Sequence, residues 1–225
     1  DVSGITLLTT AAANGHEQVV DLLLRHGAEI DLQDSRGCTA LMGAAGNGYK
    51  RVVEFLLKHG AEINLQANEG GAALMSAGKN GHERTVDLLL QRGAEINLQE
   101  SLGHTALMFA AGSGHERVID LLLRRGADID LQVSDGSTAL IIATGSNKPA
   151  AVQRLLRAGS DTTLRGGDGK TALMHAKDGG HTECARAIEE HVGERKMGTG
   201  TGGGTEGALA SSVTWSFLIV LCTPG

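Results

Sequence analysis

Residues 100–132 read ESLGHTALMFAAGSGHERVIDLLLRRGADIDLQ, and this stretch decides the fold because the chain repeats it. Thr105 precedes a short apolar run, which predicts an N-cap and a first helix from Ala106 to about Gly112. Apolar residues at helical spacing predict a second helix from about Glu116 to Arg125. Gly126 then provides a residue suited to the left-handed turn that ends a helix. The stretch therefore predicts two short helices followed by a loop.

The same pattern recurs with a period of 33 residues. Shifting the sequence by one period aligns glycines, alanines and leucines in columns, among them the leucine column Leu8, Leu41, Leu74, Leu107, Leu140 and Leu173. Six consecutive repeats without insertions are expected at residues 1–33, 34–66, 67–99, 100–132, 133–165 and 166–198. A fixed period of this size predicts a solenoid in which each repeat packs against its neighbours.

Composition and charge exclude several classes of protein. The 225 residues include 33 glycines but only 2 prolines, and 41% are hydrophobic, which argues against a collagen-like or fully disordered chain. Aromatic residues make up 2%, so the core must be aliphatic. The net charge is −6 and no basic run is interleaved with aromatic residues, so we expect no nucleic-acid partner.

The repeat resembles an ankyrin repeat over residues 1–198. The family pattern of Gly-x-Thr-Pro-Leu-His, Ala-Ala, Gly-His, an apolar second helix and Gly-Ala-Asp-x-Asn is matched by GHTALMFAAGSGHERVIDLLLRRGADID and its copies. The sequence departs from the family where Ala106 replaces the proline and Met108 the histidine. The resemblance implies an all-α ankyrin-repeat solenoid of stacked helix-turn-helix repeats, whose projecting hairpin-like loops form a concave surface.

The resemblance also implies a function. Ankyrin repeats bind proteins through their loops and inner helices and have no catalytic activity of their own. We therefore expect a monomeric protein-protein interaction scaffold or adaptor that is not an enzyme and has no cofactor, metal or small-molecule substrate. The alternative is that the chain is a fragment, the substrate-recognition arm of a larger enzyme or membrane protein such as a ligase, kinase or channel. The full-length sequence would separate the two hypotheses.

Two recurring side-chain patterns resemble chemical sites. His16, His82, His115 and His181 recur in one column, but neighbouring members should lie about 10 Å apart. A zinc ion needs each ligand nitrogen within about 2.1 Å, so we interpret the column as structural. Pairs such as Asp128 with Asp130 resemble acid/base carboxylates, but the same columns contain Asn97 and Thr163, which favours a role in turns.

Positions that vary between repeats are the candidate contacts with a protein partner. At the loops and inner-helix ends they are Arg36, Cys38, Asn47, Glu69, Asn80, Leu102, His104, Phe109, Ser113 and Asp135. We expect a hot spot at Leu102, His104 and Phe109, because exposed apolar and aromatic residues would be unusual on this surface. The alternative is that Phe109 packs against the neighbouring repeat.

The two ends of the array differ. The last repeat has Ala187 and Glu189 in place of leucines and reads as a polar C-terminal cap. The first repeat keeps the full pattern, so it should expose an uncapped face including Leu22 to Leu24. We expect further repeats upstream.

The last 27 residues lie outside the repeats. Thr199 to Gly207 reads as a flexible linker, and the 10-residue apolar run Val213 to Cys222 is shorter than the roughly 20 residues that span a bilayer. That run is a disordered or artefactual segment, a docking segment or the start of a truncated membrane anchor, and only the last would make this a membrane protein. The three cysteines are scattered without a C-x-x-C pair, which favours a reducing compartment, the cytoplasm or else the nucleus.

Overall fold

The computed structural model describes residues 6–198, and within this range the chain forms helices and loops without a strand. The helices are α1 (Leu7–Ala13), α2 (Glu17–Arg25), α3 (Ala40–Gly46), α4 (Lys50–Lys58), α5 (Ala73–Lys79), α6 (Glu83–Gln91), α7 (Ala106–Ser113), α8 (Glu116–Arg124), α9 (Ala139–Gly145), α10 (Pro149–Arg157), α11 (Ala172–Asp178) and α12 (Thr182–Gly198). The two helices predicted for residues 100–132 are α7 and α8, so that prediction is confirmed.

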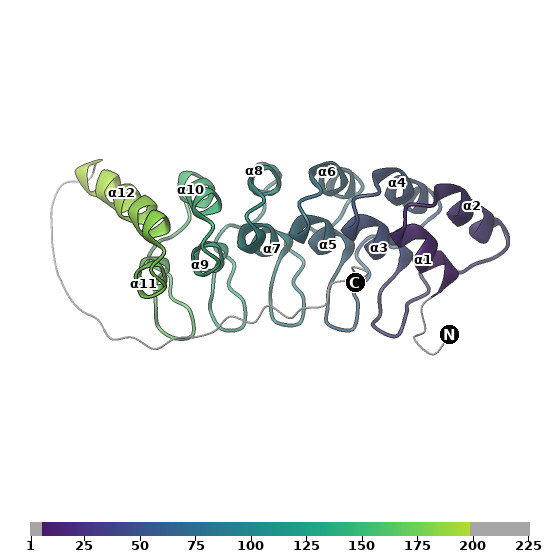
Figure 1. Ribbon diagram of the computed structural model, residues 1–225, viewed down its shortest axis with the longest axis horizontal. Helices are drawn as coiled ribbons and strands as arrows, with labels where there is room; N and C mark the ends of the chain where they lie inside the picture. Colours follow the sequence, from purple (N-terminus) through teal and green to yellow (C-terminus); the bar gives the residue numbers. More distant parts are fainter. Residues whose placement is uncertain (1–5, 199–225) are drawn as a thin grey trace.

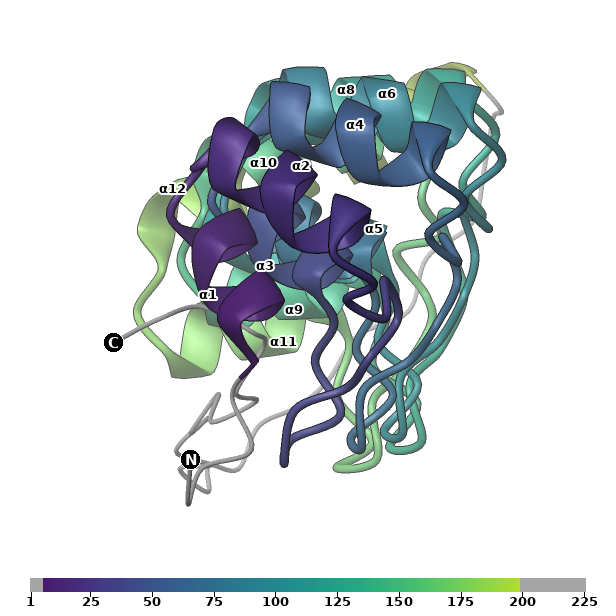
Figure 2. The ribbon, with the colours of Figure 1, turned by 90° about the vertical axis from the view of Figure 1, so that its right-hand side faces the viewer.

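The helices form two layers along one axis (Figure 1). The odd-numbered helices form an inner layer in which each packs against the next, and the even-numbered helices form an outer layer above them. The loops between helix pairs project from the inner layer in the same direction (Figure 2). The result is the all-α solenoid with projecting loops that the repeat pattern predicts.

Local sequence sets the limits of the short inner helices. The Oγ1 of Thr105 accepts a hydrogen bond from the amide of Met108, which caps the start of α7. Gly114 ends the same helix with φ of +84°. The equivalent Gly48 is needed for a second reason, since a Cβ atom there would lie 2.5 Å from Nδ1 of His82 in the next repeat. The glycine column that contains Gly48 and Gly114 therefore marks both helix ends and contact points between repeats.

The core is aliphatic and continuous along the solenoid. Leucines of the outer helices are fully buried at the same position in successive repeats, at Leu56, Leu89, Leu122 and Leu155. Met42, Met75 and Met108 occupy the position where the family pattern has histidine, and all three are buried in the inner layer. Closely stacked short helices leave room for alanine, leucine and flexible methionine rather than large rings, which explains the low aromatic content.

Ion pairs join the outer helices of neighbouring repeats. An arginine of one helix reaches a carboxylate of the preceding outer helix in the pairs Arg51 with Glu17, Arg92 with Glu54, Arg125 with Asp87, and Arg154 with Glu116 and Asp120. The mixed charges of the outer layer are thus partly matched across repeats. Arg154, which stands where the repeat pattern has leucine, binds two carboxylates of α8 at 3.2 and 2.5 Å.

The first and last repeats have different outer faces. Leu7 is 75% exposed and Leu22 is 56% exposed, whereas the equivalent Ala40 and Leu88 are buried against a preceding repeat. The expected apolar N-terminal face is therefore present. On α12, Glu189 and Glu190 are exposed while Ile188 packs inward, as expected for a polar cap.

The predictions made for the tail lie outside the described residues. These are the linker at residues 199–207 and the apolar run at residues 213–222. Within residues 6–198, none of the helices has the length and apolar character that crossing a membrane requires.

Candidate functional site

The loop tips form one row of exposed side chains along the solenoid. We call it the tip row. It consists of the third residue of each of the second to sixth repeats, namely Arg36, Glu69, Leu102, Asp135 and Asp168. Backbone hydrogen bonds connect neighbouring tips. The carbonyl oxygens of Arg36, Glu69 and Leu102 each accept the amide of the next loop at 2.8 to 3.0 Å. The backbone under the tip row is therefore held from Arg36 to the loop of Asp135, while the exposed side chains vary.

We number each loop by the repeat that it begins. In the second and in the fourth loop, a buried carboxylate holds the turn from beneath. Asp34 accepts the amides of Arg36 and Cys38 at 2.9 and 2.8 Å through Oδ1. Glu100 stands at the same position in its repeat and accepts the amide of Leu102 at 3.0 Å. Because the first residue of the loop accepts the backbone amides of the turn, the side chain of the tip residue contributes little to it, Arg36 only through a 3.5 Å contact with Asp34. This explains why residues as different as arginine and leucine occupy the tip row.

The fifth and sixth loops are stabilised by the tip residue itself. Oδ1 of Asp135 accepts the amide of Ser137 at 2.8 Å, and Oδ1 of Asp168 accepts the amide of Lys170 at 3.0 Å. The first residues of these repeats, Val133 for example, have no carboxylate. The acidic tips of these two loops thus combine a turn-forming role with an exposed negative charge.

The third loop uses a bond to its neighbour. Its first residue is Ala67, and the side-chain amide of Asn68 donates to the carbonyl oxygen of Ser35 at 3.0 Å. Glu69 at the tip is exposed and is left without a side-chain hydrogen bond or ion pair to any of residues 6–198. Its carboxylate is therefore available to a partner.

A row of glutamines connects the bases of the loops. Nε2 of Gln66 donates to the carbonyl oxygen of Gly70 in the following loop at 2.7 Å and to that of Gln99 at 2.9 Å. Gln33 and Gln99 make the equivalent two bonds one repeat before and after. The contact role of these residues was not predicted from the sequence, although the identical glutamine at the end of four repeats was a usable signal.

Two of the candidate contact residues at the ends of the inner helices already make hydrogen bonds within the protein. The amide of Asn47 donates to the carbonyl oxygen of Gly43 at 2.9 Å. The amide of Asn80 donates to the carbonyl oxygens of Gly46 in the preceding repeat and of Ser76 at 3.0 and 3.1 Å. Ser113 is half-buried in the last turn of α7. Asn47 and Asn80 therefore hold helix ends and offer a partner mainly their amide oxygens.

Two of the predicted contact residues are buried rather than exposed. Phe109 is 5% exposed and Cys38 is 3% exposed. Phe109 shares its column with Ser76 and Ile142, which are buried as well. The expectation that Phe109 is an exposed aromatic residue is therefore wrong, and the alternative that it packs in the core describes its position. Of the expected hot spot, Leu102 is exposed and lies in the tip row.

His104 lies between the tip row and the core. Its Nδ1 donates to Oε1 of Glu100 at 2.7 Å, and its ring packs on that of Phe109. Its side chain is mostly buried. His104 therefore supports the loop that carries Leu102 and presents little surface of its own.

Two lysines near this surface have shifted pKa values. Burial at the end of α5 lowers the pKa of Lys79. A hydrogen bond to Asp178 raises the pKa of Lys170, with the charges of Asp178 and Asp168 adding to it. Asp168 is also 3.5 Å from Nε2 of His175. The acidic tip of the sixth loop is therefore partly neutralised, in contrast to Glu69.

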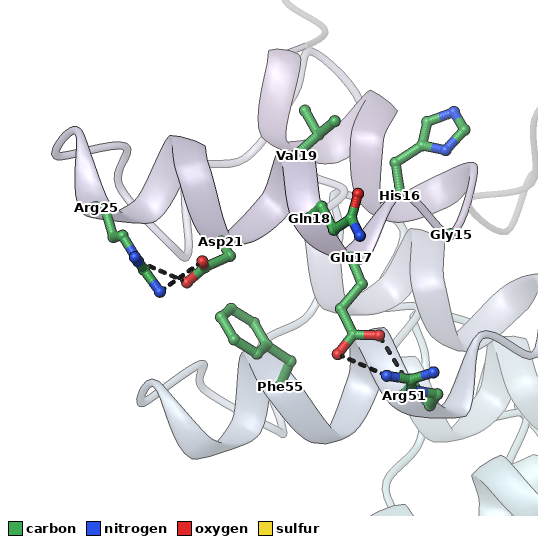
Figure 3. A pocket seen from close by; sticks show the side chains of 9 residues that line it. All are labelled: Gly15, His16, Glu17, Gln18, Val19, Asp21, Arg25, Arg51 and Phe55. Carbon is green, nitrogen blue, oxygen red and sulfur yellow. Dashed lines mark hydrogen bonds and ion pairs between the residues drawn. The ribbon is translucent and has the colours of Figure 1, made fainter.

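A shallow groove between α2 and α4 belongs to the outer layer and not to this surface (Figure 3). On α2, Arg25 pairs with Asp21 at 2.8 Å, and Arg51 of α4 pairs with Glu17 of α2 at 3.1 Å across the groove (Figure 3). Both carboxylates are thus bound by arginines. The groove results from the packing of two outer helices. Its side chains do not include a pair of carboxylates placed for acid/base catalysis.

The histidine column has a structural role. Nε2 of His82 donates to the carbonyl oxygen of Gly46 at 3.0 Å, and Nε2 of His115 donates to that of Lys79 at 2.9 Å. Each ring thus joins an outer helix to the end of the preceding inner helix. Within residues 6–198, no cluster of histidine, cysteine or acidic side chains is arranged to hold a metal ion.

Comparison with known families agrees with this geometry. Residues 1–67 and 74–165 match the family model of ankyrin repeats (3 copies), and the chain therefore belongs to the ankyrin repeat family. Ankyrin repeats are generally protein–protein interaction modules and are typically non-catalytic. A search of curated proteins found no match.

Proposed function

We propose that this chain is a protein-binding scaffold or adaptor that uses the tip row and the neighbouring inner-helix ends to hold one partner. In this proposal it acts as a monomer in the cytoplasm, without a cofactor and without catalysis of its own. One observation carries the proposal. The tip row has a backbone fixed by bonds between repeats, and it presents side chains of different charge and polarity.

The physical argument concerns the cost of binding. A surface whose backbone is already ordered loses little conformational freedom when a partner docks, so more of the contact energy appears as affinity. The side chains of Arg36, Glu69 and Leu102 are exposed and contribute little to their own turns. They are therefore free to determine which partner binds.

The test is a selection of ligands on the purified chain. A displayed library of random peptides is enriched on the immobilised protein, and the binding of the enriched peptides is measured for two double variants. The tip variant carries Glu69→Lys and Leu102→Ser, and the control variant carries Glu83→Lys and Arg117→Glu on the outer helices.

We expect the tip variant to lose at least about tenfold in affinity, since central interface residues carry most of the binding energy. The control variant should bind as the unmodified chain does. The proposal would be contradicted if the enriched peptides lost affinity only for the control variant, or equally for both variants.

A further inference from the structure

We propose that the middle of the tip row binds an extended segment of a partner in which one apolar side chain lies between two cationic side chains, each three residues away. The inference rests on the proposed function and specifies the chemistry of the partner. Leu102 would hold the apolar side chain, and Glu69 and Asp135 would pair with the cations on either side.

Leu102 provides the apolar centre. The residue is 52% exposed although its backbone is held on both sides. The amide of Leu102 donates to Oε2 of Glu100 at 3.0 Å, and its carbonyl oxygen accepts the amide of Ser134 at 2.8 Å. The hydroxyl of Ser134 donates to the same oxygen at 2.6 Å. These bonds fix the loop, so the leucine side chain remains in solvent where an apolar partner side chain would cover it.

Carboxylates lie in the tip row on both sides of Leu102. Glu69 belongs to the preceding loop and makes no ion pair with the residues that the structure describes, as noted above. Asp135 belongs to the following loop, is exposed and uses Oδ1 for the amide of Ser137, which leaves Oδ2 for a ligand. A ligand that covered Leu102 would therefore meet a negative charge in each direction along the row.

The ends of the tip row limit the length of this arrangement. Arg36 is cationic and lies 3.5 Å from Asp34, so the charge of the tip residue changes sign one loop before Glu69. On the other side, Lys170 and His175 surround Asp168. The acidic stretch that flanks an apolar centre is thus confined to the third, fourth and fifth loops.

The spacing of the loops determines the spacing of the ligand. Neighbouring repeats are separated by about 8 to 10 Å, as packed helices are. A polyproline II chain rises about 9 Å per turn of three residues, so residues three apart project on the same side. In a β-strand, residues three apart point to opposite faces. The row therefore fits a polyproline II segment of the form Lys-x-x-Leu-x-x-Lys, with arginine able to replace lysine.

The experiment uses the full chain and a fluorescein-labelled peptide, Lys-Pro-Pro-Leu-Pro-Pro-Lys, with fluorescence anisotropy as the readout. Two control peptides replace the leucine by serine or both lysines by glutamate, and a third places the lysines two residues from the leucine. A fourth is a helix-forming peptide with the lysines seven residues from the leucine, which also spans about 10 Å.

We expect the first peptide to bind and each control peptide to bind at least about fivefold more weakly. In the protein, Leu102→Ser should weaken binding about tenfold. The double variant Glu69→Gln with Asp135→Asn should weaken it about threefold to tenfold, because each exposed ion pair contributes modestly. Asparagine keeps the acceptor that Ser137 uses, so the fold is unchanged. Glu29→Gln, an exposed carboxylate outside the tip row, is the matched control and should have no effect.

Several outcomes would overturn the inference. These are equal binding of the glutamate peptide, tighter binding of the helical peptide, or an unchanged affinity of the double variant. The library selection described under the proposed function separates this failure from a broader one. Enriched peptides that lack flanking cations but bind the single variant Leu102→Ser more weakly would leave the proposed function standing and refute the basic-apolar-basic segment.

Discussion

The ring of Phe109 lies against the ring of His104, with centroids 5.4 Å apart and planes inclined by 32°. His104 is held in turn by Glu100, whose carboxylate also accepts the amides of two residues in the same loop. The loop that carries Leu102 therefore rests on a buried aromatic side chain of α7. Changes to the core at this point reach the candidate binding surface through His104.

Replacing Phe109 by alanine should destabilise the protein strongly. The ring is buried, so its loss leaves a cavity and costs about 3 to 5 kcal/mol. Urea unfolding followed by circular dichroism measures the change. Phe55→Ala is the matched control on an outer helix, where the ring is only half-buried and the loss should be smaller. An unchanged unfolding midpoint for Phe109→Ala would show that the ring does not support the core.

Replacing Asp130 by asparagine should stabilise the protein at neutral pH. Burial raises the pKa of Asp130 above its ordinary value of 3.8, and the nearby charges of Asp161 and Asp128 add to the shift, while the hydrogen bond from the amide of Asp161 opposes it. Asn97 at the same position of the preceding repeat accepts the amide of Asp128 at 2.9 Å, so asparagine fits there.

The direction of the pH effect follows from the raised pKa. The stabilising contribution of Asp130 is complete below its unfolded pKa and is lost as the pH rises through the folded value. The advantage of Asp130→Asn should therefore be absent below about pH 3.8 and reach a few tenths of a kcal/mol at pH 7, since the site is largely solvated. Urea unfolding across this range measures it, and the reverse change Asn97→Asp should be destabilising at pH 7. An advantage that is independent of pH would exclude this cause.

Replacing Arg154 by glutamine should test the ion pairs of the outer layer. Arg154 binds Glu116 and Asp120 of the preceding repeat, and we expect a loss of about 0.5 to 1 kcal/mol at low salt. Screening should reduce this loss at about 0.5 M NaCl. Arg157→Gln removes an exposed arginine of the same helix as a control. Equal losses for both variants in urea unfolding would indicate a general charge effect instead of specific pairs.

Replacing Gln66 should weaken the coupling of the loops. Gln66→Ala removes two hydrogen bonds and should cost about 1 to 2 kcal/mol. Gln66→Glu should cost more, because a carboxylate would face two carbonyl oxygens. Gln18→Ala on the exposed face of α2 is the control and should be neutral. Hydrogen exchange would show faster opening of the third loop, and unchanged exchange there would contradict a coupling role.

The sequence predicted the helices and the layers because the same residue types recur in register. Thr105, Gly114 and Gly126 marked helix limits that the structure confirms. Exposure was harder to predict. Phe109 looked like a surface residue because its column contains glycine, serine, isoleucine and histidine, and the residue type alone does not show that the column faces inward.

The hydrogen bonds that hold the loops beneath the tip row could not be predicted from the sequence either. Asp34 and Glu100 differ in length, yet each carboxylate reaches the same backbone amides of its loop. Only the folded loop shows that an acidic first residue releases the third residue from forming the turn. Residue variation alone therefore indicated where the surface lies but not which side chains are free.

The glutamine row has a consequence for how such an array changes length. Because Gln33 and Gln66 bond to equivalent atoms of the following loop and repeat, a deletion of residues 67–99 would place Gln66 next to a loop that offers it the same acceptors. Duplication of that segment would likewise create a junction already present elsewhere in the chain. Unequal recombination within the gene would thus add or remove one of these whole repeats while keeping the glutamine bonds at the new junction.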